Sequence, residues 1–98
     1  MYEKYNEFVE GKTYTLMRND EILLFFKCIR TDDSDNSIKV RFLGFAEGLV
    51  QYKRNGGGYK FGFRDDENIE YVNKQVEYKD SEWIYLNCLD DNECIIDN

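Results

Sequence analysis

Alternation of apolar and charged residues in one short segment constrains this chain more than any other feature. Ile38, Val40 and Phe42 occupy every second position there, and Lys39 and Arg41 stand between them. Successive side chains of a β-strand point to opposite faces, so a period of two indicates a strand with one face in the core and the other in water. The fold therefore has to provide a sheet for this strand.

Two hairpins are predicted on either side of it. Residues 12–17 and 21–30 form the first, because both are rich in β-branched and aromatic residues and a polar turn separates them. Residues 49–54 and 59–64 form the second, around the Asn-Gly-Gly-Gly sequence at 55–58. Glycine adopts the positive φ angles that tight hairpin loops require, which supports this second turn.

The remaining C-terminal segments are less regular. Residues 66–79 suit either a short helix or a pair of short strands, and the strands are slightly favoured. Residues 81–89 form the predicted last strand, with Ile84 on one face and Trp83 and Tyr85 on the other.

These segments predict an all-β or β-rich α+β fold. Short strands separated by turn signals favour a small antiparallel barrel or a strongly bent meander sheet of five to seven strands. Tyr2, Tyr5 and Phe8 recur every three residues, which indicates a short N-terminal helix over one end of the sheet. Residues 1–98 are expected to be a single domain, because two cores of half this size would be too small to be stable.

The composition excludes several kinds of chemistry. The sequence has no histidine, which removes His-based catalytic triads, His-ligated zinc and ordinary acid–base catalysis near neutral pH. A pair of carboxylates would suffice for a glycosidase, but a chain this short leaves little room for a substrate cleft. We therefore expect a protein that is not an enzyme, with no cofactor and no metal site.

The cysteines and the apolar runs bear on the compartment. Cys28, Cys88 and Cys94 lack the CxxC spacing of zinc and redox sites, which favours reduced thiols in the cytoplasm. A secreted protein with a Cys88–Cys94 disulfide is the alternative. We expect no membrane partner, since no apolar run is long enough to cross a bilayer and no secretory signal precedes the first strand.

Charge is unevenly distributed along the chain. The formal net charge is −7, but residues 1–64 carry 11 basic and 9 acidic side chains, whereas residues 65–98 carry 2 basic and 11 acidic ones. A surface this rich in carboxylates repels phosphates and attracts the basic clefts of other proteins. Its candidate partner-binding residues are Asp65, Asp66, Glu67, Glu70, Glu82, Asp90, Asp91 and Glu93. The alternative is an acidic surface that only keeps a small domain soluble.

Trp83 and Tyr85 are candidate aromatic anchors of the same interface. If Ile84 faces inward, both rings project outward beside Glu82, and exposed aromatic rings near charges are typical of protein interfaces. In the opposite phase Trp83 lies at the centre of the core. The sequence is equally compatible with both arrangements.

The basic and aromatic hairpin is a second candidate surface. Its residues are Lys53, Arg54, Tyr59, Lys60, Phe61, Phe63 and Arg64. Cations that follow phosphates and rings that stack on bases are what single-stranded nucleic-acid binding requires. The alternative is ordinary strand alternation, which places the aromatic rings in the core and Lys60 and Arg64 in water.

The sequence therefore predicts a non-enzymatic binding protein whose acidic C-terminal third engages a basic surface of a protein partner. An excess of residues with AT-rich codons, together with the small size, favours a phage or mobile-element inhibitor of host nucleic-acid machinery or antiviral defence. Such a protein would act in the cytoplasm of a bacterial host. The alternative is a small β-barrel that binds single-stranded nucleic acid or nucleotides through the basic aromatic hairpin.

Overall fold

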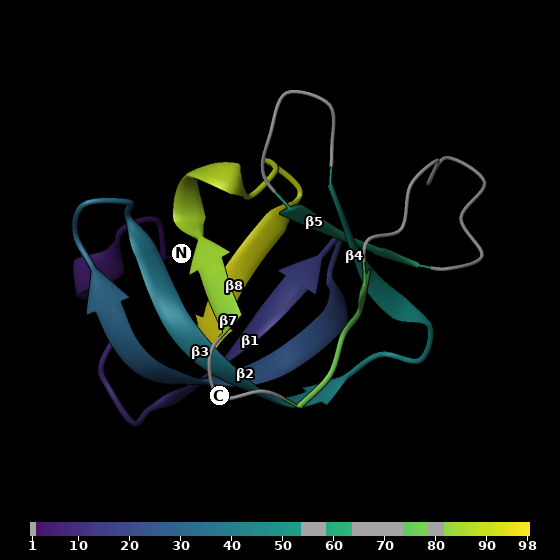
Figure 1. Cartoon of the computed structure of the whole chain (residues 1–98), viewed down its shortest axis with the longest axis horizontal. Helices are drawn as coiled ribbons and strands as arrows, with labels where there is room; N and C mark the ends of the chain where they lie inside the picture. Colours follow the sequence, from purple (N-terminus) through teal and green to yellow (C-terminus); the bar gives the residue numbers. More distant parts are fainter. Residues whose placement is uncertain (1, 54–58, 64–73, 79–81) are drawn as a thin grey trace.

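A strongly curved five-stranded antiparallel sheet forms the body of the molecule (Figure 1). The computed structural model describes residues 2–53, 59–63, 74–78 and 82–98. Across the large sheet the strands are β7 (Glu82–Tyr85), β3 (Ser37–Phe45), β2 (Glu21–Asp32), β1 (Thr13–Arg18) and β8 (Glu93–Asp97). A smaller sheet contains β5 (Tyr59–Phe63), β4 (Leu49–Lys53) and β6 (Lys74–Gln75). The prediction of an all-β fold is confirmed, and the form it takes is a bent sheet that does not close into a barrel.

The first predicted hairpin joins β1 to β2. Asn19 and Asp20 occupy the turn with φ angles of 51° and 65°. A type I′ turn requires two consecutive residues in the left-handed conformation, and its twist matches that of the flanking strands. Asn and Asp tolerate this conformation better than other residues with a Cβ. The Asn19 N–H also donates to the carbonyl of Asn92, 2.9 Å away, which ties the turn to the segment before β8.

Irregular pairing bends the long hairpin of β2 and β3. The register shifts between Phe25 and Phe26 and again between Cys28 and Arg30. Extra residues of this kind increase the local twist and curve the strand. The second shift leaves Ile29 without a cross-strand partner and sets Arg30 opposite Lys39, so both basic side chains lie on the outer face of the sheet.

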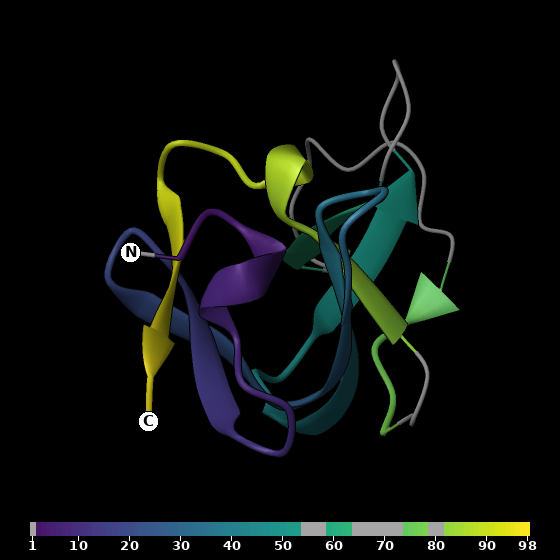
Figure 2. The same cartoon turned by 90° about the vertical axis from the view of Figure 1, so that its left-hand side faces the viewer.

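The core lies inside the curve of the large sheet. Phe42 is buried there, as the alternation of residues 38–42 predicts, and Tyr14 and Phe26 are buried beside it. The small sheet lies across one end of the large one (Figure 2) and contributes Phe61, whose ring centroid is 6.1 Å from that of Phe42 in an edge-to-face contact. This packing between the two sheets encloses the core where the large sheet does not close on itself.

Two predicted elements differ from the observed ones. The N-terminal helix is a single 3₁₀ turn, η1 (Tyr5–Glu7), because the backbone becomes extended at Phe8, whose side chain enters the core. Residues 81–89 were predicted to form the last strand, but the observed strand ends at Tyr85 and a second 3₁₀ turn, η2 (Leu86–Cys88), follows it. The last strand is β8, which the sequence did not predict. Tyr85 pairs with Ser37, the first residue of β3, so residues beyond Tyr85 have no neighbouring strand with which to continue the ladder.

The uncertain segment 66–79 lies mostly outside the described residues. Within the described part, Lys74 and Gln75 form β6 and pair with Gln51 and Val50 of β4.

Candidate functional site

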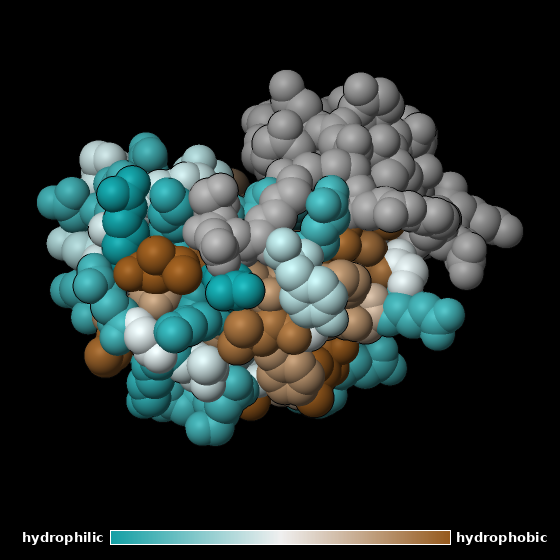
Figure 3. Space-filling model, turned by 60° about the horizontal axis from the view of Figure 1, so that its bottom comes forward, coloured by the Kyte–Doolittle hydropathy of each residue, from teal (hydrophilic) through white to brown (hydrophobic). Residues whose placement is uncertain are grey.

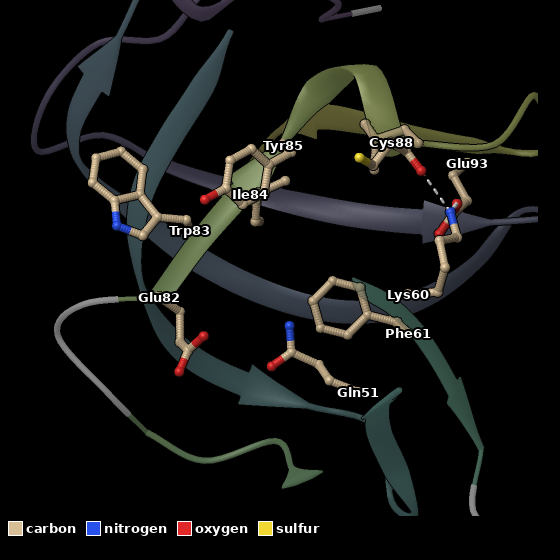
Figure 4. Close-up of a pocket in the computed structure, with 10 residues that line it drawn as sticks. Gln51, Lys60, Phe61, Glu82, Trp83, Ile84, Tyr85, Cys88 and Glu93 are labelled. Atoms are coloured by element: carbon tan, nitrogen blue, oxygen red, sulfur yellow. Dashed lines mark hydrogen bonds and ion pairs between the residues drawn. The ribbon is translucent and has the colours of Figure 1, made fainter. Parts of the chain in front are cut away.

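A buried ion-pair network joins the two sheets at one end of the molecule (Figure 4). Lys60 of β5 extends toward Glu93 of β8, and its Nζ lies 2.6 Å from Glu93 Oε1. The other carboxylate oxygen of Glu93 accepts from the Arg18 guanidinium at 3.0 Å. The side chains of Lys60 and Glu93 are only 4% and 1% exposed, so this pair is shielded from water.

Further polar groups complete the network. Lys60 Nζ donates to the carbonyl of Cys88 at 2.8 Å and lies 3.1 Å from Asp90 Oδ2. The Asp90 N–H donates to Glu93 Oε1 at 2.8 Å, and Arg18 also donates to a backbone carbonyl of β5. Buried charges are tolerated only when they are paired and their hydrogen bonds are satisfied, which this arrangement achieves.

The network corrects two expectations from the sequence. Glu93 was expected on a partner-binding acidic surface and Lys60 on a nucleic-acid-binding hairpin, yet the two side chains bind each other in the interior. Phe61, another residue of the predicted hairpin surface, is 7% exposed and packs in the core. The reason is that both faces of β5 are covered, one by the core and the other by the segment from η2 to β8.

A polar groove, which we call the acidic groove, runs between the N-terminal segment and the η2–β8 segment. Its volume is about 420 Å³, and the exposed carboxylates of Glu3, Asp90 and Asp91 line it together with Lys4. Asp90 and Asp91 were predicted from the sequence, whereas Glu3 was missed because 87 positions separate it from Asp90 in the chain. Here the structure brings part of the acidic third together with the N-terminus.

Asn36 holds the two sides of the acidic groove in place. Its φ angle of 48° turns the chain into β3, and its side-chain oxygen accepts from the Tyr5 N–H at 2.9 Å. Its side-chain nitrogen donates to the Glu3 carbonyl at 3.1 Å and to Asn87 Oδ1 at 3.0 Å. Asn36 was not predicted from the sequence, although Asn tolerates a left-handed turn position better than most other residues with a Cβ.

A smaller cavity lies on the other side of the ion-pair network (Figure 4). Its volume is about 170 Å³, and its lining includes Gln51, Phe61, Glu82 and Ile84. Small-molecule sites usually measure about 300–1,000 Å³, so this cavity is below that range. Lys60 and Glu93 also border it, but their hydrogen bonds are taken up within the network.

Trp83 and Tyr85 lie on the outer side of β7, as the phase with Ile84 inward predicts. Ile84 is 3% exposed, whereas Tyr85 is 40% exposed and Trp83 is half-buried. The Trp83 ring has the Arg30 guanidinium carbon 5.4 Å from its centroid and Lys39 Nζ 5.9 Å from it. These contacts are cation–π interactions with the outer residues of β2 and β3. Glu82 faces the opposite way, toward the small cavity.

Most of the other predicted site residues cannot be placed in the site. Asp65, Asp66, Glu67, Glu70, Arg54 and Arg64 lie outside the described residues, as do the side chains of Lys53 and Tyr59. Phe63 is half-buried and packs against the core. The acidic and the basic surfaces predicted from the sequence are therefore placed only in part.

The thiols and carboxylates of the described ranges do not gather in a way that suits a metal ion. No group of three or more Cys, Asp or Glu side chains with metal-binding geometry lies within residues 2–53, 59–63, 74–78 and 82–98. The three cysteines are free, and burial raises the pKa of the Cys28 thiol to about 11. In the same ranges, no helix has the length and apolar character needed to cross a membrane.

Comparison with known proteins adds no functional assignment. No protein-family model, curated protein or solved structure matches the chain.

Proposed function

We propose that this chain is a non-enzymatic binding protein that engages a basic surface of a partner protein through the acidic groove. The observation that carries the proposal is the position of Glu3, Asp90 and Asp91, three exposed carboxylates around a groove of about 420 Å³. Complementary charge accelerates the association of two proteins and selects against partners of like charge. A lysine or arginine side chain of the partner complements the charge of such a groove.

The frame around the groove supports this function. Asp90 is fixed by its backbone hydrogen bond to Glu93 and by its ion pair with Lys60. On the opposite side, Asn36 fixes the backbone that carries Glu3. A site held in place before binding loses less conformational entropy when the partner docks.

The form of this function that the composition favours is an inhibitor of nucleic-acid-handling proteins. Such proteins carry basic clefts for phosphates, and an exposed carboxylate surface complements those clefts. Origin from a phage or mobile element and action in a bacterial cytoplasm belong to the same proposal and rest on the size and composition of the chain.

Capture of the partner tests the proposal. The immobilised protein is incubated with a nuclease-treated lysate of a low-GC bacterium, and retained proteins are identified and purified. The double variant Glu3→Lys/Asp91→Lys is expected to lower the association rate of the purified partner and to weaken its dependence on salt. Asp90 and Glu93 are left intact, because both belong to the ion-pair network and their replacement would also lower the stability of the fold.

A matched control distinguishes the effect of charge in the acidic groove from the effect of the net charge of the protein. Asp33→Lys/Glu47→Lys changes the net charge by the same amount at exposed positions outside the groove. Equal association rates for the two double variants would reject the acidic groove as the binding site. Failure to retain any protein from the nuclease-treated lysate would reject the function.

A further inference from the structure

Strand β7 has an unpaired edge in the described part of the chain, where it pairs with β3 alone. The Leu86 N–H donates to the Asn36 carbonyl at 3.1 Å, which fixes the hydrogen-bond pattern of the β3–β7 ladder. In an antiparallel pair, the backbone groups of successive residues point alternately toward the partner strand and away from it. Ile84 therefore bonds to β3, whereas the backbone groups of Trp83 and Tyr85 point away from it.

The outward backbone groups of β7 have no hydrogen bond among the described residues. They are the N–H and C=O of Trp83 and the N–H of Tyr85. The Tyr85 carbonyl is at the N-cap of η2, where it accepts the first hydrogen bond of the turn. A row of unpaired backbone groups at the edge of a sheet is a template for pairing with a further strand.

The other strands of the large sheet do not offer such an edge. β2 and β3 are paired on both sides, so their exposed Phe25 and Leu43 present side chains alone. Figure 3 shows an apolar area beside a hydrophilic one on the underside of the molecule. β8 ends the sheet on the other side, but Ile95 at its centre is fully buried, so a partner cannot reach its backbone there. Strand addition to this sheet is therefore favoured at β7.

The small cavity of about 170 Å³ lies beside the same edge (Figure 4). The Trp83 ring points away from it, whereas Ile84 and Phe61 point toward it. A strand added to β7 would direct every second side chain to this inner side. An apolar cavity of about 150 Å³ holds a benzene-sized group, so the space suits one leucine-sized side chain.

The far wall of the cavity selects a single strand as its occupant. This wall is formed by Gln51 of β4 and Phe61 of β5. A second copy of the chain that paired through its own β7 would place its own β3 where this wall stands. An extended segment of another protein brings no such neighbouring strand.

Local charge on the outer side of β7 indicates the chemistry of that segment. The Arg30 guanidinium carbon and Lys39 Nζ lie 5.4 and 5.9 Å from the centroid of the Trp83 ring, and Lys39 stands opposite Trp83 in the ladder. An added strand would lie about 10 Å from β3, a distance that a lysine and a glutamate side chain together span. Acidic side chains on the outer side of the segment therefore complement these two cations.

From these observations we propose that the edge of β7 binds an extended acidic segment of a partner protein by strand addition. Backbone hydrogen bonds to Trp83 and Tyr85 hold the segment, one apolar side chain fills the cavity, and acidic side chains alternate with it on the outer side. This segment is opposite in charge to the partner of the acidic groove. The two proposals therefore stand or fall separately.

A capped peptide of sequence ETELETE has these features, and Trp83, the only tryptophan of the chain, reports its binding. At about 150 mM salt the Debye length is about 8 Å, so the repulsion due to the net charge of −7 is largely screened. Titration of the whole protein to about 1 mM peptide is expected to give a saturable change in Trp83 fluorescence. Absence of binding in this range would overturn the proposal.

Amide hydrogen exchange locates the bound peptide. With free peptide at about ten times the dissociation constant, about one protein molecule in eleven is unoccupied, so exchange of the Trp83 and Tyr85 N–H groups should slow about tenfold. The Ile84 N–H, which already bonds to β3, should change less. Unchanged exchange at Trp83 and Tyr85 would reject strand addition even if the fluorescence changed.

Three control peptides test the three features of the segment. EETLTEE has the same composition without the alternation, KTKLKTK reverses the charge, and ETEAETE removes the side chain that fills the cavity. Each is expected to bind at least about tenfold more weakly than ETELETE. Equal binding of EETLTEE or ETEAETE would reject the proposed geometry, and equal or tighter binding of KTKLKTK would assign the edge to a basic segment.

A pair of matched variants tests the role of the cations. Lys39→Gln should weaken binding of ETELETE about two- to fivefold, the range measured for exposed ion pairs. Lys27→Gln makes the same charge change at an exposed position of β2 and should leave the affinity unchanged. Equal losses in the two variants would indicate a response to net charge alone and would contradict the proposal. A peptide-free dimer that ETELETE dissociates would assign the edge to a second copy of the chain.

Discussion

Replacement of Glu93 by glutamine tests the ion-pair network. Glutamine has nearly the same shape but no charge, so Lys60, with 4% of its side chain exposed, would lose its buried counter-ion. Removal of one partner of a buried ion pair costs about 3–5 kcal/mol, whereas a domain of this size has a total unfolding free energy of about 5–15 kcal/mol. Glu93→Gln is therefore expected to remove a large fraction of the stability.

Urea unfolding followed by tryptophan fluorescence measures this effect. With a urea m-value of about 1–3 kcal/mol/M, a loss of at least 3 kcal/mol lowers the midpoint by about 1 M or more. Asp91→Asn makes the same charge change at an exposed position two residues away and should alter the unfolding free energy by less than about 0.5 kcal/mol.

A double variant that removes both charges distinguishes the loss of the ion pair from a loss of packing in the interior. Lys60→Met/Glu93→Leu removes both charges and keeps apolar volume in the interior, so it should be more stable than Glu93→Gln. Arg18 then loses its carboxylate, but its side chain is 21% exposed and can reach water. A loss below about 1 kcal/mol in Glu93→Gln, or a double variant less stable than the single one, would refute the reasoning.

Two further predictions concern titration. Cys28 is fully buried, and burial raises its pKa to about 11. At pH 8 a thiol reagent such as DTNB should therefore modify Cys28 only after unfolding, whereas the other two cysteines should react in the native protein. Modification of all three cysteines in the native protein would contradict this prediction. The Tyr2 hydroxyl donates to Asp97 Oδ2 at 2.6 Å, and this bond, with Lys12, lowers the pKa of Asp97. Its stabilising effect should be present above the unfolded pKa of about 3.9 and be lost as pH falls through the folded pKa. Tyr2→Phe should raise the Asp97 midpoint in an NMR titration of the carboxyl carbons, and an unchanged midpoint would show that Lys12 alone is responsible.

Local sequence patterns were sufficient to predict most of the fold. Ile38, Val40 and Phe42 alternate with charged residues, and all three are buried in β3. The end of the strand predicted for residues 81–89 was wrong, because it depends on a neighbouring strand that is distant in sequence. The predicted last strand stops at Tyr85 because β3 begins opposite it, and nothing in the local sequence carries that information.

The candidate site was harder to predict from the sequence, because it too depends on residues far apart in the chain. Glu93 and Ile95 are two positions apart and both buried, so alternation within β8 contains a signal that Glu93 faces inward. The density of neighbouring carboxylates obscured this signal. Its counter-ion Lys60 lies 33 positions away, and no local pattern identifies such a pair.

The pairing of β1 with β8 determines when the molecule can fold. Thr15 lies opposite Ile96, and Tyr2 bonds to Asp97, 95 positions further along the chain. Contacts between residues so distant in sequence are slow to form, because much chain entropy is lost before they contribute energy. During synthesis, Arg18 and Lys60 emerge long before the Glu93 carboxylate that neutralises them. The buried network can therefore form only once residue 93 has left the ribosome, and until the acidic residues of 65–98 have emerged, residues 1–64 carry a net positive charge.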